Sequence, residues 1–84
     1  MSTQTIERTT LTHLIYNEDY TRKVLPFIKA EYFANRNERV VFEEIEKFLD
    51  KYNSLPTKET LTIGVDNRKD INDEEYKKIV DIIS

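Results

Sequence analysis

His13 is the only histidine in this 84-residue chain, and the chain contains no cysteine. A transition-metal site built on His and Cys needs at least two such ligands at short spacing, so none is expected. A catalytic dyad would need a hydroxyl or carboxylate beside His13, and no local spacing suggests one. We therefore interpret His13 as a polar-face or boundary residue of a helix, with catalysis as the alternative.

Two acidic stretches could in principle perform acid–base chemistry or bind a hard cation. One is Glu43, Glu44, Glu46 and Asp50 within an expected helix, and the other is 73–75 at the start of another. We expect both stretches to lie on solvated faces, and the second also to be favoured by the helix dipole. A basic surface on a partner protein is the alternative use of these carboxylates.

Gly64 is the only glycine, which rules out a phosphate-cradling glycine-rich loop. The segment 66–70 offers oxygen ligands but lacks the spacing and the downstream glutamate of a calcium loop. We therefore predict no catalytic, cofactor-binding or metal-ligating residue and no cofactor in this chain.

A small basic patch beside aromatic residues is the main nucleic-acid signal in the sequence. Single-stranded DNA binds where cations follow its backbone and aromatic rings stack on its bases. However, aromatic residues at helical spacing are better explained as core, and a net charge of −3 with mixed signs supplies no strong basic field. Direct nucleic-acid binding is therefore expected to be weak or absent. The residues concerned are Arg22, Lys23, Arg36, Arg39, Tyr20, Tyr32 and Phe33.

Apolar spacing predicts helices along almost the whole chain, which is long enough for one modest core. We expect an all-α fold, a small bundle of about five helices, in a single domain over residues 1–84. The segment 1–7 is polar and has no apolar run, so we expect no signal peptide or membrane span, and a chain without cysteine fits an expected cytoplasmic location. The expected elements are helices over 3–16, from 18 or 19 to a break at Pro26, over 36–52 and after Asn72, with a turn at 29–33 and an undecided segment, helical or extended, at 57–65.

Polar residues mark the expected helix starts. Asn35 or Asn37 is expected to cap the third helix and Thr57 the fourth segment. Asn72 with Glu75 forms a capping box before the last helix. Glu43 stands four residues before Lys47, so an ion pair within the third helix is expected. The residues expected to be buried are Ile6, Thr10, Leu11, Leu14, Ile15, Tyr32, Phe33, Val41, Phe42, Ile45, Phe48, Leu49, Tyr52, Tyr76, Ile79, Val80 and Ile83.

The order of several short apolar motifs resembles the N-terminal domain of DnaB-type replicative helicases, especially the version in T-even-like phages. That domain begins with a helix ending in a hydrophobic pair. A short helix, an acidic–aromatic–Phe step, a long helix with Phe-x-x-Ile, and a proline before the next helix then follow in order. The corresponding segments here are 11–16, Tyr20, 24–28, 31–33, 42–45 and 55–57.

The resemblance implies a role in the collar of a hexameric ring helicase. Its expected partners are primase, a helicase loader and other helicase subunits. ATP and Mg²⁺ would bind only in a C-terminal RecA-like ATPase domain, because this chain has no Walker motif. The chain also ends before the helical hairpin through which family members pair, so pairing in that manner is not expected of residues 1–84. The resemblance implies no individual functional residue. Two alternatives to a helicase domain are a stand-alone protein-binding regulator and the helicase-binding domain of a primase.

Overall fold

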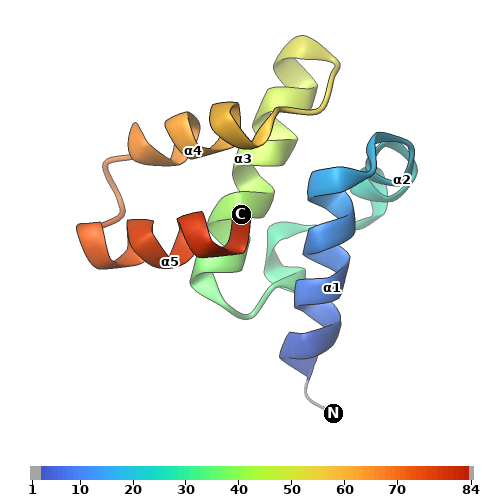
Figure 1. Cartoon of the computed structure of the whole chain (residues 1–84). Coiled ribbons are helices and arrows are strands. Elements are labelled where there is room, and N and C mark those ends of the chain that lie inside the picture. The colour runs from blue at the N-terminus through green and yellow to red at the C-terminus, as the bar shows by residue number, and fades with distance from the viewer. Residues whose placement is uncertain (1–2, 84) are drawn as a thin grey trace.

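The structure is a computed structural model that describes the backbone of residues 3–83 and the side chains of residues 6–83. All regular elements in this part of the chain are helical, as the sequence predicts (Figure 1). They are α1 (Thr3–Tyr16), α2 (Glu18–Val24), the 3-10 turns η1 (Leu25–Phe27) and η2 (Ala30–Tyr32), α3 (Arg36–Tyr52), α4 (Lys58–Asp66) and α5 (Asp73–Ile83).

Side-chain caps set the starts of α2, α3 and α4, and that of α5 through Asn72, which is described below. The Asn17 carboxamide accepts the Tyr20 N–H at 3.0 Å, and Asn35, not Asn37, accepts two N–H groups at the start of α3. Thr57 Oγ1 accepts the Thr60 N–H at 3.1 Å, so the undecided segment is a capped helix. These bonds satisfy amide groups that would otherwise lack a partner in the first turn of each helix.

Pro26 breaks the second helix where the sequence predicts. A proline lacks the N–H that an α-helix interior needs, and its ring obstructs the preceding turn. The chain therefore leaves α2 after Val24 and makes the two short 3-10 turns, with an extended residue, Ile28, after the first.

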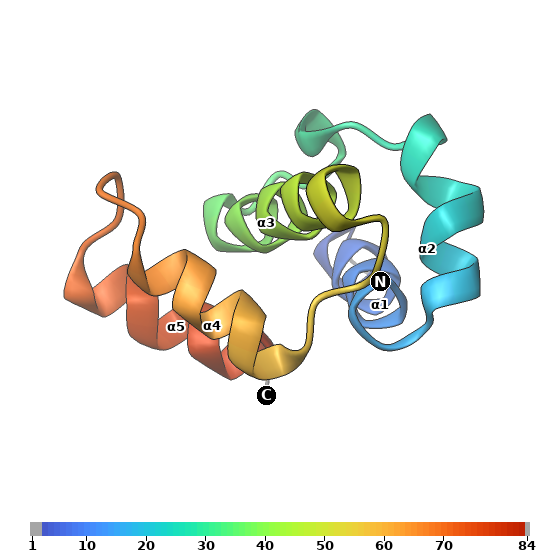
Figure 2. The same cartoon turned by 90° about the horizontal axis from the view of Figure 1, so that it is seen from above.

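Helix α3 is the central element of the bundle. It packs against α1 and η2 on one side and against α4 and α5 on the other (Figure 2). Helices α4 and α5 run antiparallel to each other as a hairpin (Figure 1). The molecule thus has two helical units, α1–α2 and α4–α5, joined through α3.

The core is aliphatic with two fully buried phenylalanines. Phe33 and Phe42 lie in its centre, with ring centroids 5.3 Å apart. Burial of such side chains supplies most of the stabilisation of a small domain. The buried apolar residues are Leu11, Leu14, Ile15, Phe33, Val40, Val41, Phe42, Ile45, Leu61, Val65, Ile79 and Ile83.

Three residues expected in the core are exposed instead. Ile6, Tyr32 and Tyr52 retain 54 %, 44 % and 56 % of their surface. Ile6 and Tyr52 lie toward helix ends, where the helical stripe continues past the elements that cover it. Tyr32 packs edge-to-face on the buried Phe33 ring and so covers the core from outside. Of the other predicted residues, Thr10, Phe48, Leu49, Tyr76 and Val80 are half-buried.

Candidate protein-docking site

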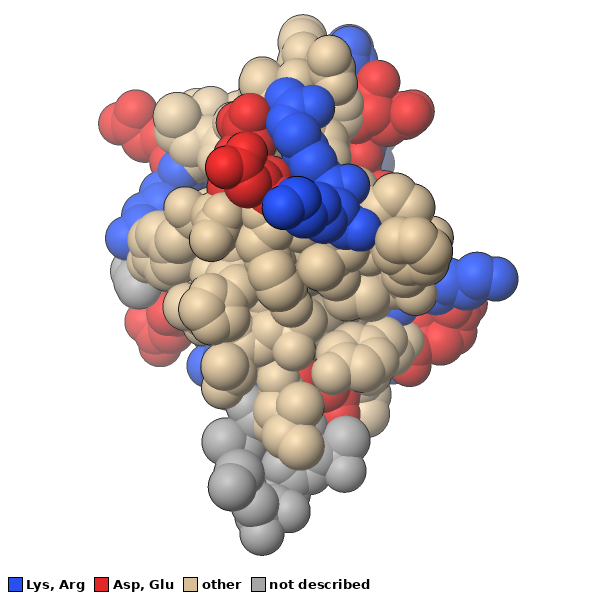
Figure 3. All heavy atoms as spheres, turned by 90° about the vertical axis from the view of Figure 1, so that its right-hand side faces the viewer, with Lys and Arg blue, Asp and Glu red and all other residues tan. Residues whose placement is uncertain are grey.

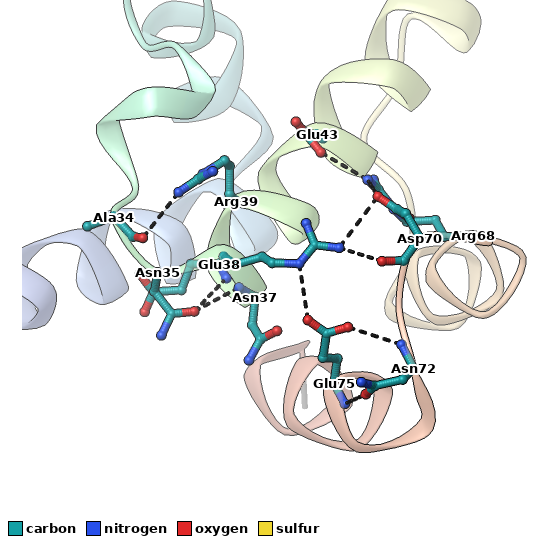
Figure 4. Close-up of polar contacts among 11 residues, drawn as sticks. Ala34, Asn35, Asn37, Glu38, Arg39, Glu43, Arg68, Asp70, Asn72 and Glu75 are labelled. Carbon is teal, nitrogen blue, oxygen red and sulfur yellow. Dashed lines mark hydrogen bonds and ion pairs between the residues drawn. The ribbon is translucent and has the colours of Figure 1, made fainter.

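Arg68, in the loop between α4 and α5, gathers three carboxylates, and we call this group the Arg68 cluster. Figure 4 labels Arg68 with two of them, Glu43 and Asp70. Its guanidinium donates to Glu44 and Glu43 at 3.1 Å each, and to both Asp70 oxygens at 2.9 and 2.8 Å. The Arg68 side chain is only 18 % exposed, and Glu44 is 8 % exposed. The cluster therefore ties α3 to the α4–α5 loop through a largely buried cation.

The Arg68 cluster corrects two predictions. Glu44 was expected on a solvated face but is buried, and Glu43 pairs with Arg68 and not with Lys47. The reason is a cation from a distant part of the chain, which compensates the cost of burying a carboxylate.

Arg68 also changes the acid–base behaviour of the cluster. Its hydrogen bonds and positive charge lower the pKa of Asp70 to about 2, and the carboxylates, Asp70 first, raise the pKa of Arg68. The pKa of Glu75 is lowered by a hydrogen bond from the Asn72 N–H and then by Arg36.

Stability is expected to fall as the pH drops from about 4 to 2. A carboxyl whose pKa is about 3.9 unfolded and lower when folded stabilises the fold above the unfolded value and loses that contribution on protonation. Urea unfolding should show that the free energy of unfolding falls less between pH 5 and pH 2.5 for Asp70→Asn than for the parent chain. The control is Asp50→Asn, which replaces an exposed aspartate outside the cluster and should leave that decrease in unfolding free energy unchanged. Equal effects of the two substitutions would contradict a lowered pKa of Asp70 as the cause.

A second arginine links the starts of α3 and α5. Arg36 contacts Glu75 Oε2 at 3.1 Å and the Asp70 backbone carbonyl. Glu75 closes the predicted capping box with Asn72, by bonds of 3.0 and 2.8 Å (Figure 4). Because Arg36 and Glu75 remain partly exposed, this link supports local geometry more than overall stability.

The predicted basic patch is not brought together. Arg36 begins α3, whereas Arg22 bonds Asn53 at the other end of this helix, about 25 Å away at 1.5 Å per residue. Arg22 also pairs with Glu18, and Arg39 donates to the carbonyls of residues 33 and 34. These arginines are therefore dispersed and engaged within the fold.

His13 is exposed near the end of α1, with its ring 5.5 Å from the Tyr20 ring. Within residues 3–83, no group of three or more His, Asp and Glu side chains is placed to hold a metal ion. The second acidic stretch, 73–75, forms the first turn of α5 as predicted.

Two buried glutamates were missed by the sequence analysis. Glu7 accepts the Ala34 N–H at 2.6 Å, and Glu38 pairs with Arg8 at 2.7 Å. Both are nearly inaccessible and fasten α1 to the entry of α3. Helical spacing indicates the burial of Glu7, because Glu7 stands four residues before the buried Leu11 and so lies on the same helical face.

A groove runs between the second half of α3 and α4, with a volume of about 290 Å³, and we call it the α3–α4 groove. Phe48 and Tyr52 form one wall, with ring centroids 4.5 Å apart. Ile63, 59 % exposed, lies on the opposite helix. Lys47 and Lys51 also line the groove from α3. The groove thus combines an apolar interior with cations along one edge.

Gly64 keeps α4 close to α3 at this groove. A Cβ atom at Gly64 would lie 2.6 Å from Glu44 Oε1, which is below any ordinary contact. The same Glu44 is held by Arg68 through its other oxygen. The absent side chain therefore leaves room for the carboxylate beneath the groove.

A second depression, the η1–α3 groove, has the opposite charge. Leu25, Pro26 and Leu49 line it together with three acidic residues, Glu43, Glu46 and Asp50, and one cation, Lys47, which also lines the α3–α4 groove. Beside it in the chain, Phe27 is 86 % exposed. Figure 3 shows the side of the molecule that carries α1 and α2, where a broad uncharged area lies below a small group of charged side chains. Consistent with this view, α1 has no Asp, Glu, Lys or Arg from Thr9 to Tyr16.

The fold and these surfaces define a small all-helical domain with two surface grooves. Over 74 residues the chain is 30 % identical to the DnaB-like replicative helicase of Enterobacteria phage T4. The match covers 88 % of this chain and 15 % of the helicase, so the chain spans a small part of that relative's length. It confirms the resemblance to DnaB-type helicases that the sequence predicts. No protein-family profile matches the chain, and no solved structure matches it significantly.

None of the helices described is long and apolar enough to cross a membrane.

Proposed function

We propose that residues 1–84 form a docking domain of a DnaB-type replicative helicase and act in DNA replication. In this role the domain contributes to the collar of the hexameric ring and binds primase or the helicase loader, in the cytoplasm of the host cell if the gene is a phage gene. The observation that carries the proposal is the similarity to a replicative helicase over 88 % of the chain.

The surface supports a docking role for the domain. Phe27, Tyr52 and Ile63 are each more than half exposed, and two of them line the α3–α4 groove. Exposed aromatic and aliphatic side chains beside a groove are typical anchors of protein–protein contacts. Hydrolysis of ATP, with its Mg²⁺, is assigned to an ATPase domain outside these residues.

The coding sequence beyond Ser84 tests the helicase assignment. We expect the reading frame to continue into a RecA-like domain with a Walker motif, which cradles nucleotide phosphates through backbone N–H groups. A stop codon directly after Ser84 would contradict the assignment and would favour a stand-alone protein-binding regulator.

A further inference from the structure

We infer that the α3–α4 groove receives an acidic, amphipathic helical segment of a partner protein. The inference deepens the proposed function and rests on it for the presence of a protein partner. The expected partner segment carries large apolar side chains on one helical face, flanked by carboxylates.

The interior of the groove fits the apolar face of such a segment. Phe48 and Tyr52 present two neighbouring rings from α3, inclined at 42° to each other, and Ile63 presents an exposed aliphatic side chain from α4. Helix-in-groove recognition inserts apolar anchors spaced at i, i+3, i+4 and i+7 into surfaces of this kind. Partly exposed tyrosine is also among the residues that contribute most to binding when they become buried.

The edge of the groove selects for carboxylates. Lys47 and Lys51 stand one helical turn apart, both are exposed, and neither forms an ion pair with any other described residue. The Lys51 ammonium lies 5.2 Å from the Tyr52 ring, at the apolar wall itself. The one carboxylate in the lining, Glu44, is already neutralised by Arg68. The groove is therefore locally cationic on a chain of net charge −3, and an acidic partner complements it.

The same helix argues against a nucleic-acid occupant. Glu46 and Asp50 are exposed on α3 next to Lys47 and Lys51 and line the acidic η1–α3 groove. A phosphate backbone extending beyond the two lysines would meet these carboxylates, whereas single-strand binding needs a continuous cationic track. A helix with a few placed carboxylates fits this short cationic edge better.

A designed peptide tests the inference on the whole chain. The probe is an amphipathic helix with leucines at i, i+3, i+4 and i+7 and flanking glutamates; its control carries lysines in place of the glutamates. The amide signal of Gly64, the only glycine, reports on the groove in NMR titrations. We expect saturable shifts of Gly64 with the acidic peptide and none with the lysine peptide.

Charge reversal supplies the matched variants. The double variant Lys47→Glu/Lys51→Glu should weaken acidic-peptide binding about tenfold, because two favourable pairs of modest energy become repulsive. Lys29→Glu/Lys77→Glu changes the net charge equally at exposed positions outside the groove and should leave the affinity unchanged. Circular dichroism of both double variants is the control that they remain folded.

Four results would overturn the inference: no Gly64 shift with the acidic peptide, equal binding of the lysine peptide, equal effects of the two double variants, or displacement of the peptide by oligothymidylate. Concentration-dependent Gly64 shifts without any peptide would overturn it in favour of a second copy of the chain. The proposed function is tested separately. If a primase or loader binds the parent chain and Lys47→Glu/Lys51→Glu equally well, only the assignment of the α3–α4 groove as the binding site is contradicted. If primase and loader bind neither chain, the docking function itself is contradicted.

Discussion

Replacing Arg68 with methionine is expected to lower the free energy of unfolding by about 3 kcal/mol, the lower end of the range for breaking a buried ion pair. The loss arises because Glu44 would remain buried without its cation, and because Asp70 and Glu43 would no longer link α3 to the loop before α5. The partial exposure of the arginine keeps the value at the lower end. Urea denaturation followed by circular dichroism at neutral pH measures it.

Two variants separate a buried-charge effect from a general one. Arg68→Met combined with Glu44→Met should recover most of the loss, because well-packed apolar residues often replace a buried pair at little cost. Arg36→Met removes a more exposed arginine from the same region and should cost no more than about 1 kcal/mol. A similar loss of unfolding free energy for Arg36→Met and Arg68→Met would contradict the claim that the buried Glu44 carboxylate depends on Arg68 for its stabilisation.

The substitution Phe42→Ala should cost about 3–5 kcal/mol, the usual range for removing a buried phenylalanine. Phe42 is fully buried on the central helix and its ring lies beside that of Phe33, so its loss leaves a cavity in the core. A domain of this length has about 4–13 kcal/mol of total stability, so the substitution removes a large share of it and should lower the unfolding temperature markedly. The same urea experiment, with thermal unfolding, measures the change.

Tyr52→Ala provides the contrast within the same helix. Its ring is 56 % exposed, so its removal should cost about 1 kcal/mol or less while weakening peptide binding in the α3–α4 groove. If Tyr52→Ala destabilised the chain as much as Phe42→Ala, the assignment of core and surface along α3 would be wrong.

Local signals in the sequence were sufficient to predict most of the fold. Asn35, Thr57 and Asn72 act through hydrogen bonds to amides two or three residues away, so their caps can be recognised within a single turn. Pro26 acts on its own backbone and breaks α2 for the same local reason. The segment 57–65 could not be decided because its β-branched residues and Gly64 oppose a helix that tertiary contacts stabilise.

The misassigned residues depend on partners distant in the sequence. The burial of Glu44 requires Arg68, which lies 24 residues away, and no periodicity links the two. Tyr52 follows the same helical stripe as Phe42, but α3 continues beyond the elements that cover that stripe. The α3–α4 groove was not predicted either, because it exists only where two helices meet around Gly64.

The docking function is tested most directly by calorimetric titration of residues 1–84 with the primase and with the helicase loader of the same replication system. We predict saturable binding of at least one of them, with a single stoichiometry and with a loss of binding at temperatures where the destabilised Phe42→Ala variant has unfolded and the parent chain has not. Absence of binding by the folded chain to both proteins, under conditions where they bind the full-length helicase, would contradict the proposal.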